Sequence, residues 1–156
     1  MTIKIILFIT LLAYSFIVSQ SFMYILALKH VQFNLQANSY IELRKLIDGE
    51  MNNNFKYVIY AALILNLGLL IVTGKNPGSL LFILSAVAFV ALIADTLLTV
   101  KGNLPINAVI DSWSSDTYPS DWAEYRTKWF SIFRYRQIAN ITGFISLLIA
   151  TVFGLK

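Results

Sequence analysis

Ionisable side chains are rare in the long apolar runs of this chain, and Asp95 is the one carboxylate within them. A charged group inside a membrane is costly, so an intramembrane carboxylate is by default a candidate for function. Asp95 could serve as a base that takes a proton from a bound molecule. The single histidine, His30, follows the first apolar run and is the second catalytic candidate, because imidazole titrates near neutral pH. A histidine at such a boundary is more often simply solvated, and both interpretations of His30 stay open.

Each apolar run carries a polar residue near the same end, namely Gln20, Tyr60, Asp95 and Asn140. At 1.5 Å per residue, all four lie within about 12 Å of that end. One interpretation is hydrogen bonding between helices, with Asp95 paired to Arg136. The other is a polar pocket that receives one residue from each of four helices. The common depth of the four residues in the membrane favours the pocket, because hydrogen bonds that only join helices could form at any depth.

A further set of candidates lies between residues 119 and 143, which we predict to be part of one long helix. Spacings of three and four residues place these side chains on a single stripe. The stripe consists of Trp122, Arg126, Trp129, Phe133, Arg136, Asn140 and Gly143. Tryptophan and arginine are typical anchors at a membrane boundary. The alternative is that the stripe forms one wall of the pocket.

Four apolar runs must position these residues. They cover residues 5–28, 57–73, 80–100 and 138–155. A membrane-spanning helix needs about 20 apolar residues, and only 13% of this chain is charged, against about 25% in soluble domains. We therefore predict an all-α fold, a four-transmembrane-helix bundle in one membrane domain over residues 1–156. The first run is longer than a signal-peptide core, so we expect it to stay uncleaved.

Two long connections, residues 29–56 and 101–119, should lie on one face of the membrane. In the first, a capping box of Ser39 and Glu42 predicts an amphipathic helix that ends at residues 52–54. Its apolar side would carry Tyr40, Leu43, Ile47 and Met51, with Glu42, Lys45 and Asp48 elsewhere. The fourth helix, with Ser120 as its N-cap, would be about 54 Å long if unbroken, so it should extend beyond the bilayer.

Composition excludes several kinds of chemistry. The chain has no cysteine and one histidine, which excludes disulfides, thiol redox chemistry and clustered His or Cys metal sites. We predict no metal and no cofactor. The basic residues flank apolar runs, so we expect contact with the lipid bilayer and not with nucleic acid. Nine of the 12 Lys and Arg residues lie on the face of the long connections, which should be cytoplasmic, in a bacterial inner membrane.

One motif resembles a known family. Gly102-Asn103-Leu104-Pro105-Ile106-Asn107 is followed by Trp113, Trp122, Arg126, Trp129 and Arg136. This series is similar to the signature of the anthrone-oxygenase-like family of small four-helix membrane proteins, most of which have no assigned function. For its characterised fungal members, the resemblance implies cofactor-independent oxidation of an anthrone to a quinone by molecular oxygen. Family members commonly have a histidine where this chain has Phe133, which leaves Asp95 as the base within the spans.

Two hypotheses for function follow. In the first, a lipophilic, aromatic or quinone-like molecule enters near the long connections, with or without oxygenase chemistry. It would stack on Trp122, Trp129 or Phe133 and meet Asp95, Asn103, Asn107 and Arg136, with Trp113 and Arg126 close by. In the second, the protein is a non-catalytic subunit that docks a protein partner or a second copy of itself. A channel or carrier ranks third, because the spans lack broken helices and repeated charges.

Overall fold

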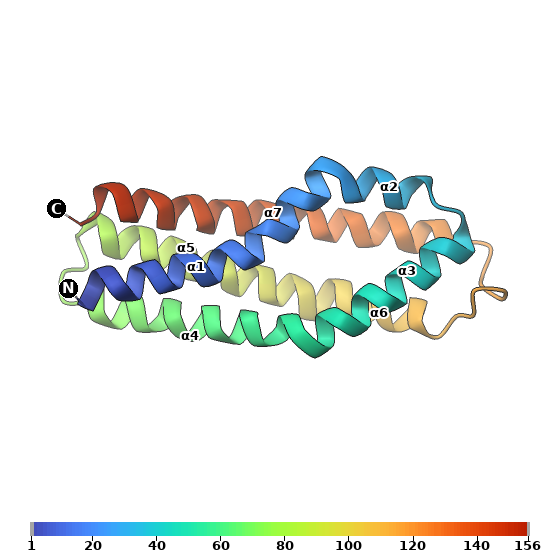
Figure 1. The fold of residues 1–156 in the computed structure, drawn as a ribbon, viewed down its shortest axis with the longest axis horizontal. Coiled ribbons are helices and arrows are strands. Elements are labelled where there is room, and N and C mark those ends of the chain that lie inside the picture. Colours follow the sequence, from blue (N-terminus) through green and yellow to red (C-terminus); the bar gives the residue numbers. More distant parts are fainter. Residues whose placement is uncertain (1, 156) are drawn as a thin grey trace.

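The structure, a computed structural model, describes residues 2–155 as a bundle of four long helical segments (Figure 1). The segments are Thr2–Asn34, Ala37–Thr73, Leu80–Asp111 and Trp122–Phe153. Each is long and apolar enough to cross a membrane, and residues 2–155 contain no strand. The predicted all-α fold with four membrane-spanning helices is therefore confirmed.

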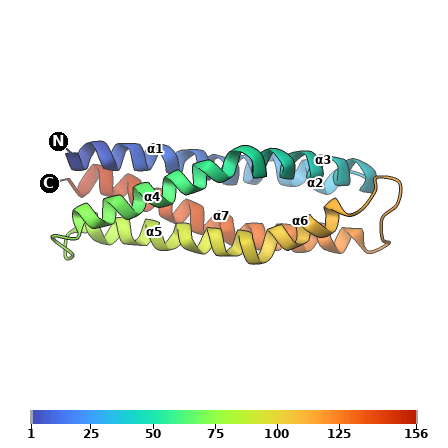
Figure 2. The ribbon, with the colours of Figure 1, turned by 90° about the horizontal axis from the view of Figure 1, so that it is seen from below.

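The segments alternate in direction along the bundle. The first and last described residues and the tight turn at residues 74–79 lie at one end, here called the turn end (Figures 1 and 2). The connections at residues 35–36 and 112–121 lie at the other end, here called the loop end. This arrangement is the one that a short turn between the second and third spans requires.

Three of the segments contain a π-helical turn, labelled η. The first segment is α1 (Thr2–Met23), η1 (Tyr24–Leu28) and α2 (Lys29–Asn34). The second is α3 (Ala37–Glu50), η2 (Met51–Phe55) and α4 (Lys56–Thr73). The third is α5 (Leu80–Leu98), η3 (Thr99–Asn103) and α6 (Leu104–Asp111), and the fourth is α7 (Trp122–Phe153). All three π-helical turns begin about 30 Å from the turn end, at the thickness of a hydrocarbon core.

Beyond the π-helical turns, all four segments continue past the predicted spans. With 32 to 37 residues each, they are about 48 to 55 Å long. The sequence predicted such an extension for the fourth helix only. The asparagines at residues 52–54 do not end a helix, because they form part of η2, which continues directly into α4. Instead Asn52 donates to Asp48 Oδ2 at 3.1 Å and Asn54 donates to Glu50 Oε2 at 2.8 Å, so both join the helix.

Two predicted helix starts were wrong. α3 begins at Ala37 with Gln36 as its N-cap, so Ser39 lies within the first turn and forms no capping box with Glu42. α7 begins at Trp122, and Asp121 takes the N-cap position that was predicted for Ser120. A cap pattern read from sequence is easily shifted by a few residues, because several neighbouring polar residues can each serve.

The two halves of the bundle have different cores. On the side of the turn end, the core is mainly aliphatic, and its buried residues are Leu7, Tyr14, Ile17, Ala62, Leu69, Leu81, Ala88, Leu92, Leu147 and Ala150. On the side of the loop end it is rich in aromatic rings, with Tyr24, Tyr40, Ile41, Ile106, Ile110, Trp129, Phe130 and Phe133. Large apolar side chains such as Phe8, Ile64 and Val90 are more than half exposed around the first half. Such a surface fits lipid and not water.

Candidate functional site

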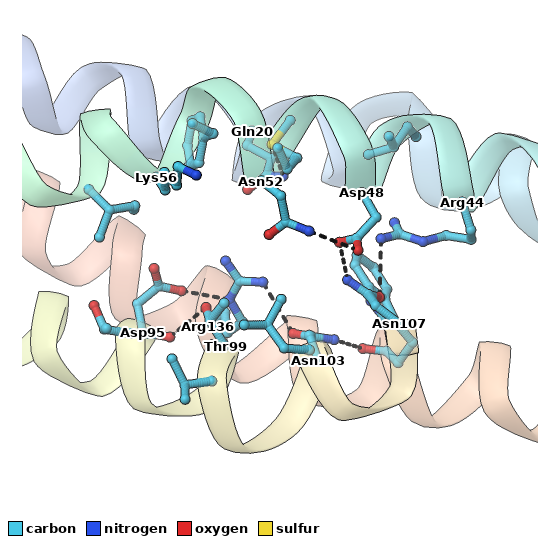
Figure 3. A pocket seen from close by; sticks show the side chains of 18 of the residues that line it. Gln20, Arg44, Asp48, Asn52, Lys56, Asp95, Thr99, Asn103, Asn107 and Arg136 are labelled. Carbon is cyan, nitrogen blue, oxygen red and sulfur yellow. Dashed lines mark hydrogen bonds and ion pairs between the residues drawn. The ribbon is translucent and has the colours of Figure 1, made fainter. Parts of the chain in front are cut away.

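A cavity of about 240 Å³ lies at the level of the π-helical turns, where the two halves meet (Figure 3). All four segments line it. The polar lining residues are Gln20, Arg44, Asp48, Asn52, Lys56, Tyr60, Asp95, Thr96, Thr99, Asn103, Asn107 and Arg136. The apolar lining residues are Ile47, Met51, Phe55, Ile59, Val100, Leu104 and Trp129. Typical ligand pockets have roughly 300 to 1,000 Å³, so this cavity has room for a small molecule or for one end of a larger one.

The inner end of the cavity contains an ion pair between α5 and α7. Arg136 Nε donates to Asp95 Oδ1 at 2.7 Å, and Arg136 Nη1 donates to Asn103 Oδ1 at 3.2 Å. The Asp95 residue is 1% exposed, and its second oxygen, Oδ2, has no hydrogen-bond partner within residues 2–155. A buried polar atom without a partner is costly. Asp95 Oδ2 therefore needs a donor that the described chain does not supply.

The outer end of the cavity is organised by Asn107. Its Oδ1 accepts hydrogen bonds from Trp129 Nε1 at 2.8 Å and from Arg44 Nη2 at 3.3 Å. Its Nδ2 donates to Asp48 Oδ1, and Asn52 Nδ2 donates to Asp48 Oδ2 at 3.1 Å. The carboxylate of Asp48 is thus held by two amides and not by a cation.

The two asparagines are placed by the local fold of α6. Asn103 ends η3 and Asn107 lies four residues later, which puts both on one helical face. Pro105 lies between them in the first turn of α6. Asn103 also donates from Nδ2 to the Trp129 carbonyl at 3.0 Å, which joins the inner and outer ends of the polar network.

The cavity crosses the expected membrane boundary. Asp95 lies 15 residues beyond Leu80 in a continuous helix, which places it about 23 Å from the turn end. Asp48 lies 25 residues before Thr73 in the second segment, which places it about 38 Å from that end. A hydrocarbon core about 30 Å thick would include the first carboxylate and leave the second at head-group level.

The mouth of the cavity opens between two neighbouring segments. One rim carries Asn52, Lys56 and Tyr60 from η2 and α4, and the other carries Val100 from η3. All four of these residues are exposed. In Figure 2 the second and third segments lie close together near the turn end and separate along the middle of the bundle. Beyond this gap α3 and α6 contact each other again, through Arg44, Asp48 and Asn107. The mouth therefore faces sideways out of the bundle.

Seven of the predicted site residues line this one cavity. They are Gln20, Tyr60, Asp95, Asn103, Asn107, Trp129 and Arg136. The predicted contact of Asp95 with Arg136 is present at 2.7 Å. Gln20 packs its amide on Met51, with Nε2 donating to the thioether at 3.7 Å. Tyr60 is 56% exposed and stands on the rim.

Phe133 does not face the cavity as predicted. Its ring is buried, stacks on Trp129 with centroids 4.9 Å apart, and contacts the Tyr24 ring at 4.7 Å. The stripe on α7 does face inward, and Trp129 and Arg136 line the cavity, whereas the Phe133 ring between them lies in the aromatic core. Asn140 is buried below the cavity and does not line it, and its Oδ1 has no partner within residues 2–155.

Four other candidates lie toward the loop end. Arg126 donates to the carbonyls of Gln32 and Leu35 at 3.2 and 3.1 Å, and its guanidinium lies 4.6 Å from the centre of the Trp122 ring. This contact ties α7 to the connection between α2 and α3. Trp113 packs edge-on against another aromatic ring, and its carbonyl accepts from Lys45. His30 is exposed on α2 and outside the cavity.

The sequence did not identify six of the polar lining residues, which are Arg44, Asp48, Asn52, Lys56, Thr96 and Thr99. Arg44 and Asp48 were placed in an amphipathic helix, with Asp48 away from its apolar side, although Tyr40, Arg44 and Asp48 are spaced four apart and share one face. That face is buried. The signal in the sequence was this spacing, which the apolar side chains of Leu43 and Ile47 beside it obscure.

The donor set of the cavity suits an organic molecule better than a metal. Within residues 2–155, no group of three or more His, Cys, Asp or Glu side chains is placed to hold a metal ion. The lining instead combines amides, two carboxylates and three cations with apolar walls. In the comparisons with known proteins, no family model, no curated protein and no solved structure matches this chain.

Proposed function

We propose that this membrane protein binds a lipophilic aromatic or quinone-like molecule in the cavity at the π-helical turns. The observation that carries the proposal is the unpartnered Asp95 Oδ2 at the inner end of a cavity with apolar walls. A ring hydroxyl that donates to this oxygen would remove the cost of leaving it unpaired. Asn103 and Arg136 stand beside it to orient a second polar group of the ligand.

The ligand reaches the cavity from the bilayer. The mouth opens sideways between Tyr60 and Val100, next to apolar side chains that face lipid. A molecule dissolved in the membrane can enter by this route without crossing water. The apolar part of the ligand packs against the side of the cavity that carries Phe55, Ile59 and Leu104, which fits the usual mixture of apolar wall and few polar groups in ligand sites.

The chemistry that the family resemblance implies assigns a definite role to Asp95. Its free oxygen accepts a proton from the activated ring of an anthrone, and the resulting carbanion reacts directly with oxygen. One oxygen atom becomes the new ring carbonyl and the other leaves as water. Phe133, at the family's usual histidine position, lies outside the cavity lining, so Asp95 acts as the base in this proposal. The bilayer is a bacterial inner membrane, with the loop end in the cytoplasm.

The alternative is a docking subunit that uses the stripe on α7 and the amphipathic helix. In the structure these two elements contact each other through Arg126 and Trp122, which pack on Tyr40. Arg44 of α3 also stacks on Trp129, with its guanidinium 4.2 Å from the ring centre. No observation favours a partner over these internal contacts, and we prefer the binding function.

A pair of tryptophan substitutions tests the proposal. Val100→Trp places a large side chain on the rim, whereas Leu97→Trp adds the same side chain to an exposed position of the same segment that does not line the cavity. A hydroxyanthrone titrated into the purified protein should quench tryptophan fluorescence saturably. We expect Val100→Trp to abolish saturable quenching and Leu97→Trp to retain it. Asp95→Asn should weaken binding about tenfold, because a hydrogen bond to a charged group is lost.

Two results would contradict the proposal. Quenching that rises linearly in all variants would show partition into detergent or lipid without a site. Equal saturable binding by the wild-type protein and Val100→Trp would place the site elsewhere. Native mass spectrometry of the membrane-extracted protein provides a separate measurement, in which a retained small molecule should be lost from Val100→Trp but not from Leu97→Trp.

A further inference from the structure

We infer that the ligand of this cavity carries a negative charge at its head group, so that the site selects an anionic amphiphile over a neutral or cationic one. The inference rests on the proposed binding function and adds the charge of the ligand. It is carried by the excess of cations over carboxylates in the lining and by the partners of those cations. The lining contains three cations, Arg44, Lys56 and Arg136, and two carboxylates, Asp48 and Asp95.

Arg44 is a buried cation that forms no ion pair in the described part of the chain, although Asp48 lies one turn further along α3. It is 3% exposed, and no carboxylate within residues 2–155 approaches its guanidinium to 4 Å. Its hydrogen bonds go to neutral acceptors, the Tyr24 hydroxyl at 3.4 Å and Asn107 Oδ1 at 3.3 Å. Buried charges are normally paired, because removing an ion from water is costly. An anion at the outer end of the cavity would provide the missing counter-charge.

The other two cations lie on the Asp95 side of the same cavity (Figure 3). Arg136 uses Nε for Asp95 and Nη1 for Asn103, and its Nη2 makes no hydrogen bond within residues 2–155. Lys56 stands on the rim and forms no ion pair in that range; its ammonium lies 5.3 Å from the centre of the Tyr57 ring. The only ion pair of residues 2–155 is that of Asp95 with Arg136, so Arg44 and Lys56 have no ion-pair partner in that range.

The position of this charge suits an amphiphile. Asp48 and Arg44 lie beyond the hydrocarbon core by the lengths derived above, and Ile59 and Leu104 provide apolar lining. A molecule that enters sideways from the bilayer brings its head group to the cations while its tail stays near the mouth. The shared chemistry is an anionic group on an apolar chain, which a free lipophilic acid and an anionic phospholipid both offer.

Fluorescence quenching in a protein with one tryptophan tests the charge. Trp113→Phe and Trp122→Phe leave Trp129, which lines the cavity, as the reporter. The probes are a decanoate and a decanol, each brominated next to the head group, and a matching brominated decylamine, added to phosphatidylcholine nanodiscs. We expect the carboxylate to quench Trp129 at about tenfold lower concentration than the alcohol, and the amine to quench least.

Three substitutions separate the cavity charge from the surface charge. Lys56→Gln should weaken quenching by the carboxylate about threefold to tenfold and leave the alcohol unchanged. Lys101→Gln removes an exposed cation from η3 that does not line the cavity, and should have little effect. Asp48→Asn removes a carboxylate from the lining and should strengthen binding of the carboxylate, a gain that misfolding cannot imitate.

The outcomes distinguish the two proposals. If the alcohol and the carboxylate quench Trp129 equally and Lys56→Gln changes neither, the cavity binds amphiphiles but the inferred charge selectivity is wrong. If no probe quenches Trp129 saturably, the binding function itself fails. Replacing phosphatidylcholine by phosphatidylglycerol identifies the source of the anion: competition with the carboxylate indicates a phospholipid, and its absence indicates a free lipophilic acid.

Discussion

At the scale of single residues, the ion pair of Asp95 with Arg136 should dominate the stability of the cavity. The two side chains are 1% and 9% exposed and meet at 2.7 Å. Replacing Asp95 by Asn leaves a buried guanidinium without its counter-ion, which costs about 3 to 5 kcal/mol of unfolding free energy. Replacing Arg136 by Gln likewise leaves the buried Asp95 carboxylate without its counter-ion. Unfolding in detergent micelles should therefore show strong destabilisation by either single change.

The double variant provides the control for this prediction. Once one charge has been removed, removing the other leaves no unpaired ion. The double variant Asp95→Asn with Arg136→Gln should lose less unfolding free energy than the sum of the losses in the two single variants. The difference should be about 1 to 3 kcal/mol. Additive losses would show that the two charges do not stabilise each other in the membrane protein.

The residues of the site could be predicted from sequence where the polar side chain interrupts an apolar run. Asp95 and Gln20 are conspicuous for this reason, and both line the cavity. Arg44 and Lys56 could not be recognised in the same way, because they lie in a stretch where charged residues are expected. Phe133 was misplaced because a helical stripe does not show which of its side chains a ring from another helix covers, here that of Tyr24.

At the scale of elements, close packing of α1, α5 and α7 depends on Gly143. A Cβ at this position would lie 1.9 Å from the Tyr14 hydroxyl oxygen and 3.2 Å from the Ala91 Cβ. Small residues at helix contacts in membranes allow such approach. Gly143→Ala should therefore destabilise the protein by about 1 to 3 kcal/mol, because the tyrosine ring must move.

A second glycine gives the matched comparison. A Cβ added at Gly68 in α4 meets no atom within 4 Å. Gly68→Ala should be neutral or should stabilise the protein by up to about 1 kcal/mol, through helix propensity alone. Thermal unfolding of both variants in one detergent checks the pair. Equal midpoints for Gly143→Ala and the wild-type protein would mean that Tyr14 is free to leave this contact.

The continuity of the elements was the least predictable feature. The apolar runs identified four spans, but the polar residues 29–56 and 101–111 looked like connections and are mainly helical. Turn-forming residues such as Asn52 favour a helix end in isolation. In the structure their side chains bond the preceding turn, and a π-helical turn absorbs the change in direction. Tertiary packing of the aromatic half decides between these outcomes, and it is not visible in local sequence.

At the scale of the whole molecule, the bundle is an aliphatic membrane half joined to an aromatic half that extends from one face. Three π-helical turns mark the junction, and the cavity lies there. Such turns are common at functional sites because they add a residue and reorient side chains. Here η2 and η3 supply lining residues on opposite sides of the mouth, Asn52 and Val100 among them. The cavity is thus a consequence of how two half-bundles meet.

The orientation of the bundle follows from charge. Nine of the 12 Lys and Arg residues belong to the loop end, whereas Lys4 and Lys75 lie at the turn end and Lys156 is outside the described residues. Because basic residues near span ends are retained in the cytoplasm, we predict that the loop end, with Thr117, is cytoplasmic. The turn at residues 74–79 should then face the outside.

The absence of native cysteine allows a direct measurement of this orientation. Lys75→Cys and Thr117→Cys each place one thiol at an exposed position, at opposite ends of the bundle. A membrane-impermeant thiol reagent added to intact cells should label Lys75→Cys, and should label Thr117→Cys only after the membrane is opened. The reverse pattern would place the aromatic half and its cations outside. The head group selected by Arg44 and Lys56 would then come from the outer leaflet, since the mouth of the cavity lies at the side of the hydrocarbon core that is nearer to the loop end.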